Sequence, residues 1–211
     1  MAELLLPYLG LCLLITITPG LDTAVVVRSV LKGGTRAGLW TAAGCAAGLF
    51  VHAVAVAVGL AGLLLRSAVA FEVVKLAGAV FLVVLGARSL WAARRAPEPV
   101  PVVSVAEGAG RWSARSPLVQ GLLTNLTNPK ATLFFLATLP QFVPADQPTR
   151  AVPVALGLAV IAVMFSLSGL GLVAVGLGRV RRWLDSPRFR QVQEGLLGVT
   201  LVALGVRVAV E

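Results

Sequence analysis

The sequence predicts an all-α integral membrane protein of six transmembrane helices, arranged as two inverted three-helix repeats whose spans one and four are broken at proline. Three observations lead to this fold class. Apolar residues make up 58% of the 211 residues and charged residues only 13%, whereas soluble domains carry about 25% charged residues. Six apolar runs are long enough to cross a bilayer. The two halves of the chain also resemble each other.

The composition excludes several other classes. A soluble domain of this length could not cover so much hydrocarbon with polar surface, and neither a disordered chain nor a disulfide scaffold is expected. Cys12 and Cys45 lie inside apolar runs and are interpreted as small hydrophobic residues. Because His52 is the single histidine, we predict no metal site and no cofactor. The N-terminal apolar stretch is too long for a signal peptide and is interpreted as a retained first span.

The spans follow from apolar runs of about 20 residues, the length that crosses a bilayer. They cover 4–30, 37–65, 69–90, 117–143, 151–178 and 192–210. Thirteen basic residues follow spans one, three and five: Arg28, Lys32, Arg36, Arg88, Arg94, Arg95, Arg111, Arg115, Arg179, Arg181, Arg182, Arg188 and Arg190. The positive-inside rule puts that side in the cytoplasm and both termini outside. Topology thus explains the net charge of +9 without nucleic acid; a lipid-headgroup or nucleic-acid site is the alternative.

The connection from Trp91 to Ser116 divides the chain. It contains Pro97, Pro99 and Pro101 and shows no apolar periodicity, which indicates a flexible cytoplasmic linker. We therefore predict a first three-helix repeat over 1–90, a linker over 91–116 and a second repeat over 117–211.

Two segments carry the internal similarity. The nonapeptides 80–88 and 199–207, separated by an offset of 119, share six of nine residues, including the ending Leu-Gly-x-Arg. Thr18-Pro19-Gly20 aligns with Asn128-Pro129-Lys130 at an offset of 110. Spans two and five show no comparable match. A repeat with an odd number of spans is inverted in the membrane, an arrangement typical of secondary transporters.

The prolines predict helix breaks at membrane depth. Thr18 and Asn128 are good N-cap residues, and Pro19 and Pro129 suit the first position of a new helix. The free N–H groups of such a helix start favour a bound anion, for example a carboxylate. The alternative is a plain proline kink packed against neighbouring helices.

Charged and amide side chains accompany the breaks. Asp22 and Lys130 lie near the middle of their runs, where a lone charge costs at least about 2.5 kcal/mol, so both are expected to face the protein interior. Asp22 could hold a substrate ammonium or exchange a proton, and Lys130 could pair with a substrate carboxylate. Asn125 and Asn128 add uncharged donors and acceptors. The alternative is a structural ion pair between Asp22 and Lys130.

Other polar residues have simpler interpretations. Glu72 and Lys75 are three residues apart near the outer end of span three, so they are expected to pair, with an outer-gate role for Lys75 as the alternative. For His52 a buried, hydrogen-bonded side chain is favoured over a proton relay. Gly44 and Gly48 predict close helix packing.

Four blocks of sequence together resemble the LysE/RhtB family of amino-acid exporters, in the family's order and over nearly the whole chain. They are Thr18-Pro-Gly-Leu-Asp-Thr23, Lys75-Leu-Ala-Gly-Ala-Val-Phe-Leu82 with Leu85-Gly86, Asn125-Leu-Thr-Asn-Pro-Lys-Ala131 and Leu139-Pro-Gln-Phe142. The chain departs from the family pattern at Leu21, where the family has proline, and at Phe81, where it usually has tyrosine. The resemblance implies a site that includes Lys75, which the residues alone do not select.

The leading hypothesis is a bacterial inner-membrane transporter, not an enzyme, that exports amino acids by alternating access, driven by protons or the membrane potential. Its partners would be the amino-acid substrate and the bilayer, with a possible homo-oligomer. The predicted substrate-binding residues are Thr18, Pro19, Gly20, Asp22, Lys75, Asn125, Asn128, Pro129 and Lys130.

The alternative is efflux of a metal cation or another toxic solute, although few soft-metal ligands are present. An intramembrane enzyme would have only Ser166, Ser168 and His52 to use. A membrane scaffold would leave the central Asp and Lys without a role.

Overall fold

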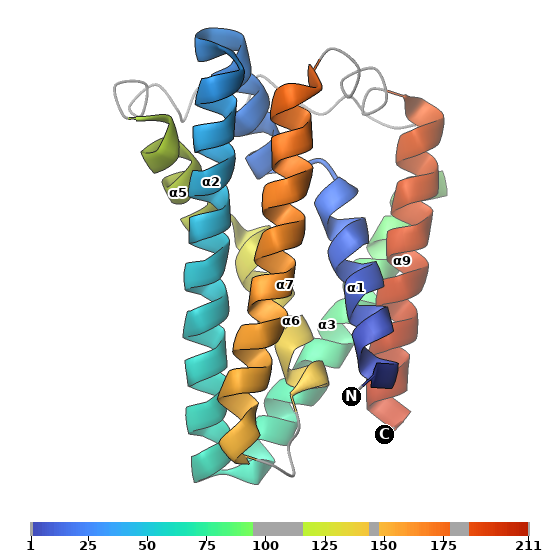
Figure 1. The fold of residues 1–211 in the computed structure, drawn as a ribbon. Helices are drawn as coiled ribbons and strands as arrows, with labels where there is room; N and C mark the ends of the chain where they lie inside the picture. The colour runs from blue at the N-terminus through green and yellow to red at the C-terminus, as the bar shows by residue number, and fades with distance from the viewer. Residues whose placement is uncertain (1, 95–115, 144–147, 178–185, 211) are drawn as a thin grey trace.

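The computed structural model describes residues 2–94, 116–143, 148–177 and 186–210, and within these ranges every regular element is an α-helix. The helices form an elongated bundle (Figure 1). They are α1 (Ala2–Ile17), α2 (Leu21–Arg66), α3 (Ala68–Arg94), α5 (Pro117–Leu126), α6 (Pro129–Phe142), α7 (Pro148–Val175) and α9 (Pro187–Val210). The all-helical class predicted from the sequence is therefore confirmed.

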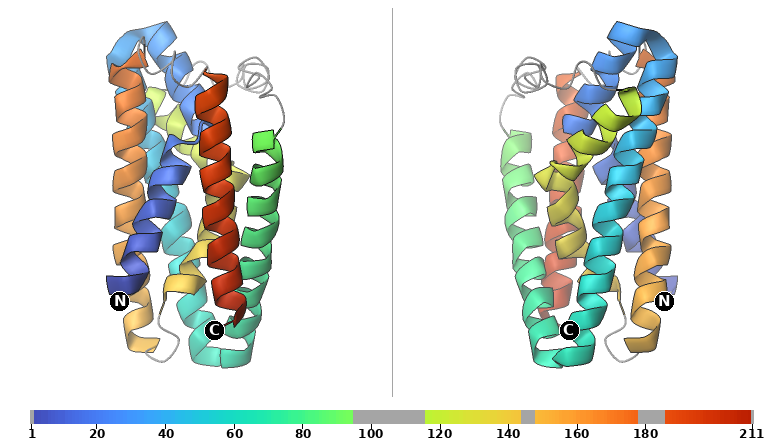
Figure 2. Two further views of the ribbon diagram at one scale, coloured as in Figure 1. Left: turned by 90° about the vertical axis from the view of Figure 1, so that its right-hand side faces the viewer. Right: turned by 90° about the vertical axis from the view of Figure 1, so that its left-hand side faces the viewer.

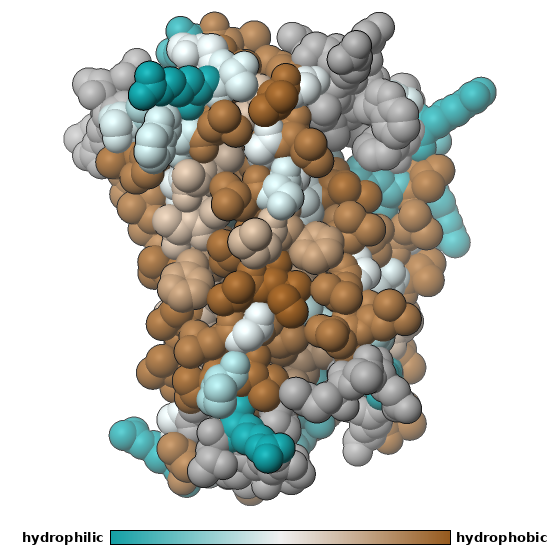
Figure 3. Space-filling model, viewed as in Figure 1, coloured by the Kyte–Doolittle hydropathy of each residue, from teal (hydrophilic) through white to brown (hydrophobic). Residues whose placement is uncertain are grey.

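The outside of the bundle is apolar along its middle. In Figure 3, hydrophobic side chains cover most of the central part of this face, and hydrophilic ones gather toward its two ends. Large apolar side chains such as Leu65, Val69 and Leu172 are 73%, 76% and 69% exposed. Three helical stretches, Leu21–Leu60, Val69–Arg94 and Arg150–Val175, are long and apolar enough to span a membrane. A surface of this kind is suited to lipid as its solvent.

A turn at Gly34 divides α2 into two segments. Gly34 has φ 73°, and it is the only described residue in the left-handed region. Glycine adopts this conformation without the steric penalty that a Cβ atom brings. Figure 2 shows that α2 turns over here, so its two segments run in opposite directions.

The helices are interrupted at the two places that the prolines predict. Helix α1 ends at Ile17 and α2 begins at Leu21. Helix α5 ends at Leu126 and α6 begins at Pro129. Both interruptions lie within long apolar runs of the sequence.

Glycines bring α2 and α5 into direct backbone contact. A Cβ atom on Gly44 would meet the carbonyl oxygen of Leu118, and one on Gly121 would meet that of Thr41. A Cβ atom on Gly48 would lie 2.9 Å from Asn125 Cβ. The close packing predicted for Gly44 and Gly48 is confirmed, and it sets the distance of Asn125 from α2.

Helices α3 and α9 also pack through glycines, and their contacts are reciprocal. A Cβ atom on Gly86 would lie 2.7 Å from the carbonyl oxygen of Gly198, and one on Gly205 would lie 2.6 Å from that of Ala79. Adding the sequence offset of 119 to Ala79 and Gly86 gives Gly198 and Gly205. If residues 119 positions apart are treated as equivalent, the contact between Gly86 and Gly198 is equivalent to the contact between Gly205 and Ala79.

Both ends of the chain lie at the same end of the bundle, opposite the turn of α2 (Figure 1). Helix α3 continues through Trp91 to Arg94, the first residues of the segment that the sequence predicts as a linker. This extension keeps the backbone hydrogen-bonded beyond the apolar run. The rest of the linker up to Arg115 lies outside the described residues.

Candidate functional site

A cavity lies where the two interruptions meet α7. Its empty volume is about 630 Å³, which includes open solvent. It is lined by Cys12, Ile15, Thr16, Thr18, Gly20, Asp22, Thr23, Leu49, Asn128, Lys130, Ala131, Phe134, Ala162, Ser166 and Leu170. The lining combines one carboxylate and one ammonium with hydroxyl groups and apolar side chains.

Two amide side chains hold the carboxylate of Asp22 in the first turn of α2. Asn125 Nδ2 donates a hydrogen bond of 2.8 Å to Asp22 Oδ2, and Asn128 Nδ2 donates one of 3.3 Å to Asp22 Oδ1. One donor comes from the end of α5 and the other from the cap of α6. Because each carboxylate oxygen can accept more than one hydrogen bond, Asp22 keeps acceptor capacity for a further donor.

Asn128 also caps α6, as the sequence predicts. Its Oδ1 accepts a hydrogen bond of 3.0 Å from the backbone N–H of Lys130. The two ends of one buried amide thus serve two purposes, since Oδ1 fixes the helix start while Nδ2 orients Asp22. Exchanging its oxygen and nitrogen would break both hydrogen bonds, so the network fixes the amide's orientation.

Lys130 reaches across to the first interruption. Its Nζ donates a hydrogen bond of 3.3 Å to the carbonyl oxygen of Thr18, a group that the end of α1 leaves free. In the part of the chain that the structure describes, no ion pair joins Lys130 to Asp22. The structure therefore does not contain the Asp22–Lys130 ion pair that the sequence left open as an alternative. An ammonium group has three donors, so Lys130 retains capacity for a ligand.

The start of α2 differs from the start of α6. Gly20 is its cap residue and provides no side chain to the first free N–H groups. The hydroxyl of Thr18 instead donates a hydrogen bond of 2.6 Å back to the carbonyl oxygen of Leu14. The prediction that Thr18 caps a helix starting at Pro19 is therefore wrong, because the chain stays non-helical for two residues longer. An uncapped helix start beside Lys130 can accept an anion.

Asn125 lies behind Asp22, away from the cavity. It is 0% exposed and does not line the cavity, and its Oδ1 has no hydrogen-bond partner. Gly48 leaves the space it occupies. Asn125 was predicted as a substrate-binding residue; the structure places it where it orients Asp22 and not in the cavity lining.

His52 connects α2 to both sides of the second interruption. Its Nε2 lies 3.1 Å from the carbonyl oxygen of Asn125, and its Nδ1 lies 3.4 Å from Thr132 Oγ1. A carbonyl oxygen can only accept, so Nε2 carries a proton, and in the neutral ring Nδ1 accepts from the Thr132 hydroxyl. The predicted hydrogen bonding of His52 is confirmed, but its side chain is half-buried and not buried as predicted. Sequence spacing gave no sign of these partners.

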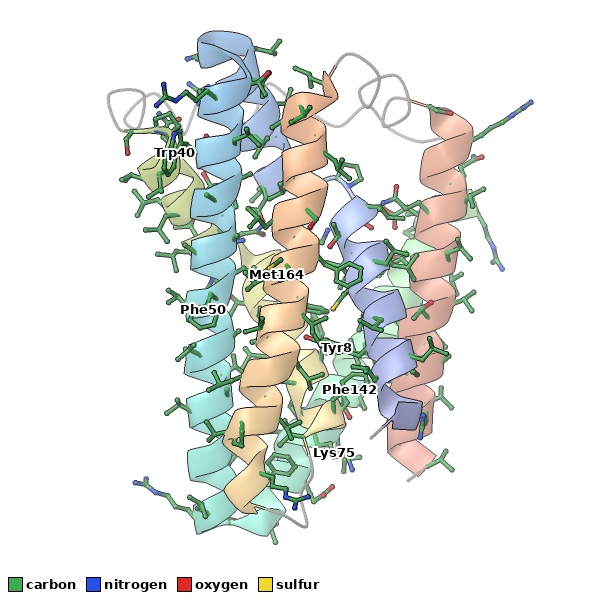
Figure 4. The ribbon with its side chains drawn as sticks, viewed as in Figure 1. Tyr8, Trp40, Phe50, Lys75, Phe142 and Met164 are labelled. Carbon is green, nitrogen blue, oxygen red and sulfur yellow. The ribbon has the colours of Figure 1, made fainter. Side chains whose placement is uncertain are left out.

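Lys75 does not join the cavity. Its Nζ lies 4.0 Å from Glu72 Oε2, the pairing that their spacing predicts, and its carbonyl oxygen accepts a hydrogen bond of 2.9 Å from Gln141 Nε2. Figure 4 shows Lys75 toward the end of the bundle where the termini lie. The resemblance alone selected Lys75, and the other predicted site residues gather at the interruptions.

Sequence reasoning missed the part of the lining contributed by α7 and by the second segment of α2. Leu49, Ala162 and Leu170 are ordinary apolar residues in spans that show no repeat signal. Thr16, Thr23 and Ser166 also line the cavity, and their hydroxyls within apolar runs were the available signal. Only the packing of the helices shows that these residues share one cavity.

The fold and the cavity define a class of protein. Apolar helices broken at depth, with opposite charges in one small-molecule cavity, are features of membrane transporters. Among the described residues, no group of three His, Cys, Asp or Glu side chains could hold a metal ion.

Comparison with known proteins identifies the family. The model of the LysE type translocator family matches residues 13–211, and the chain belongs to this family. It is 31% identical over 203 residues to the homoserine/homoserine lactone efflux protein of Salmonella typhi, covering 96% of this chain and 94% of that protein. It is 27% identical over 208 residues to the leucine efflux protein of Klebsiella pneumoniae subsp. pneumoniae, covering 97% and 93%.

A further relative is an uncharacterized membrane protein of Bacillus subtilis, 27% identical over 210 residues, covering 96% of this chain and 97% of the relative. No solved structure matches the chain significantly. The family and these relatives show that the protein is a bacterial membrane transporter of the amino-acid efflux type and not an enzyme.

Proposed function

We propose that the protein exports amino acids, or close derivatives, from the cytoplasm by gradient-driven alternating access, with the substrate bound at the two helix interruptions. The observation that carries this proposal is the pairing of Asp22 and Lys130 in one cavity without an ion pair between them. A zwitterion needs one acceptor for its ammonium and one donor for its carboxylate. The cavity offers both.

The substrate carboxylate binds between Lys130 and the start of α2. Lys130 Nζ uses one donor on the carbonyl oxygen of Thr18, and its other donors remain for a ligand. Gly20 leaves the first N–H groups of α2 without a side-chain acceptor, and the helix dipole favours negative charge there. Hydrogen bonds to charged groups contribute about 1.5–3 kcal/mol each, so this pair of donors can select a carboxylate.

The substrate ammonium binds to Asp22. Both amides that hold this carboxylate are themselves fixed, because Asn125 is fully buried and Asn128 caps α6. A carboxylate held in this way is already oriented when the substrate arrives, which reduces the entropic cost of binding. Thr18, Pro19 and Pro129 carry no side-chain charge. Their proposed role is in the backbone, since Thr18 and Pro19 lie in the first interruption and Pro129 begins α6.

Alternating access would use two inverted three-helix repeats, residues 1–90 and 117–211, joined by the segment 91–116. The reciprocal glycine contacts of α3 and α9 support this arrangement, since Gly86 and Gly205 are related by the offset of 119. Transporters of this kind rock one repeat against the other around a fixed central site. Six spans result when α1 is joined to the first segment of α2, and α5 to α6.

The proposed orientation places the protein in the bacterial inner membrane with both termini outside. The turn of α2 carries Lys32 and Arg36, and α3 ends at Arg94. Figure 2 shows both of these ends opposite the termini. Basic residues favour the cytoplasmic side. A proton gradient or the membrane potential would supply the driving force, and a homo-oligomer is compatible with the apolar surface.

Transport into proteoliposomes tests this function. A panel of labelled amino acids is offered with an inward-acid gradient present or collapsed, and protein-free liposomes serve as the control. We expect uptake of a subset of amino acids that falls to the control level when the gradient is removed. A flat panel from folded protein would overturn the proposal and favour a metal cation or another toxic solute as substrate.

A further inference from the structure

We propose that the transported amino acid has an uncharged, mainly apolar side chain, bound in an apolar part of the cavity by Leu49, Phe134 and Ala162. This inference rests on the proposed function and adds the substrate class. It follows from how the charges and the apolar side chains of the lining are distributed around the interruptions.

The charges of the lining match the backbone groups of one amino acid and nothing more. Among the lining residues, Asp22 is the one carboxylate and Lys130 the one ammonium. The ammonium and carboxylate of a zwitterion use both. A lysine or arginine side chain would need a second carboxylate, and a glutamate side chain a second cation, and neither is among the lining residues. Glu194 of α9 is close enough to Lys130 to interact with it electrostatically, but it does not line the cavity. Burying an unpaired charge is costly, so a charged side chain is disfavoured.

The apolar part of the cavity begins one helical turn from the charged part. Phe134 follows Lys130 by four residues on α6 and therefore lies on the same face, one turn further along. Cys12 lies on α1, six residues before Thr18, and also lines the cavity. These positions place hydrocarbon beyond the head-group site, along the direction that a side chain would take.

Residues from other helices close this apolar part. Leu49 of α2 and Ala162 of α7 line the cavity, and both belong to the same buried hydrophobic cluster as Phe134 and Cys12. The end of the cavity is thus continuous with the hydrophobic core. Burying the CH₂ groups of a ligand stabilises its binding, so an aliphatic side chain binds here more tightly than a cationic one.

The hydrophobic core where α1 meets α6 contains a close aromatic contact. The rings of Tyr8 and Phe142 are 5.0 Å apart in an edge contact, and Tyr8 Oη donates a hydrogen bond of 2.8 Å to the carbonyl oxygen of Leu158. Figure 4 shows Tyr8 and Phe142 beside each other, between α1 and α6. Tyr8 and Phe142 are both buried in the same hydrophobic cluster as Leu49, Phe134 and Ala162, so the apolar part of the cavity adjoins packed hydrocarbon.

Norleucine and lysine form the matched pair for a test, because lysine has the same carbon chain with an ammonium group at its end. Gradient-driven uptake of each labelled compound is measured with the full chain in proteoliposomes. We expect norleucine to be taken up at least tenfold faster than lysine at equal low concentration. Equal or faster uptake of lysine would overturn this inference and leave the proposed function standing. A folded protein that transports no amino acid would overturn the proposed function itself.

A variant pair adds a charge where the apolar part is proposed. Ala162→Asp is expected to lower the ratio of norleucine to lysine uptake at least tenfold, because it supplies the missing carboxylate. Ala162→Asn has nearly the same shape without the charge and should leave the ratio close to that of the wild type. The same shift in both variants would contradict the assignment of Ala162. If Ala162→Asp does not fold, the wild-type ratio still decides the inference.

Discussion

Gly20 and Lys130 face each other across the two helix interruptions, although they are equivalent positions in the two halves of the chain. They are separated by the offset of 110 that relates the two proline motifs, and a Cβ atom on Gly20 would lie 3.8 Å from Lys130 Nζ. Equivalent residues that touch each other lie close to the axis relating the two halves. In the proposed repeat arrangement, the cavity is therefore at this axis.

The chemistry of the two halves nevertheless differs. The same offset pairs Asp22 with Thr132 and Thr18 with Asn128. One half supplies a carboxylate and an uncapped helix start, and the other supplies an ammonium and a capped one. A symmetric pair of like charges would attract one end of a zwitterion and repel the other, whereas this arrangement offers one group to each end.

The contact between α3 and α9 should be sensitive to a single added methyl group. In Gly86→Ala the new Cβ atom would lie 2.7 Å from the carbonyl oxygen of Gly198, so the backbones must separate. We expect a loss of about 1–3 kcal/mol in the free energy of unfolding, measured by denaturant titration in detergent. Gly59→Ala is the control, since a Cβ atom on Gly59 has no neighbour within 4 Å. Equal effects of both variants would show that α3 and α9 do not depend on this contact.

Removing the charge of Asp22 should abolish transport. In Asp22→Asn, one side-chain oxygen must replace two, while Asn125 and Asn128 both donate to this position. The new amide nitrogen then faces a donor and cannot hold the substrate ammonium. We expect uptake to fall at least tenfold with the protein still present in the membrane, as measured by immunoblot and flux. Glu72→Gln makes the same charge change outside the cavity and should keep wild-type flux; a loss in both would point to a general charge effect.

The sequence predicts the helices and their interruptions well because each has a local cause. Composition and run length predict apolar helices, proline ends a helix, and Asn128 before Pro129 is a strong cap signal. The error at Thr18 shows the limit of local reasoning. Its hydroxyl donates a hydrogen bond back to the carbonyl oxygen of Leu14 in α1 instead of capping the next helix. The local sequence allows both of these interactions.

The parts of the site that could not be predicted depend on packing between distant segments. Asn125 looks like a cavity residue in the sequence, yet Gly48 lets it pack behind Asp22. Leu49 and Ala162 have no local signal at all, since any apolar residue in a span has the same pattern. Resemblance placed Lys75 in the site, whereas the structure places it beside Glu72.

Lys130 should contribute to substrate affinity, while Lys75 should not. Lys130→Met keeps most of the side-chain volume and removes the ammonium that bonds to Thr18. We expect the KM for uptake to rise roughly 10- to 100-fold, from about 1.5–3 kcal/mol for a charged hydrogen bond. Lys75→Met removes the same charge outside the cavity and should leave KM within about twofold. If the two variants changed KM alike, the carboxylate site would have to lie elsewhere.

His52 should stabilise the second interruption rather than bind the substrate. His52→Phe keeps an aromatic ring but removes both hydrogen bonds, to the carbonyl oxygen of Asn125 and to Thr132. Each bond contributes about 1 kcal/mol, and the buried carbonyl would be left without this donor. We expect faster hydrogen–deuterium exchange in the peptides that cover Asn125 to Thr132, with unchanged exchange in α9. His52→Gln retains a donor and an acceptor and should restore part of the protection.

Because His52 does not line the cavity, the order of preference among amino acids should stay the same in both variants. A reordered preference without any change in exchange would show instead that His52 acts on the substrate.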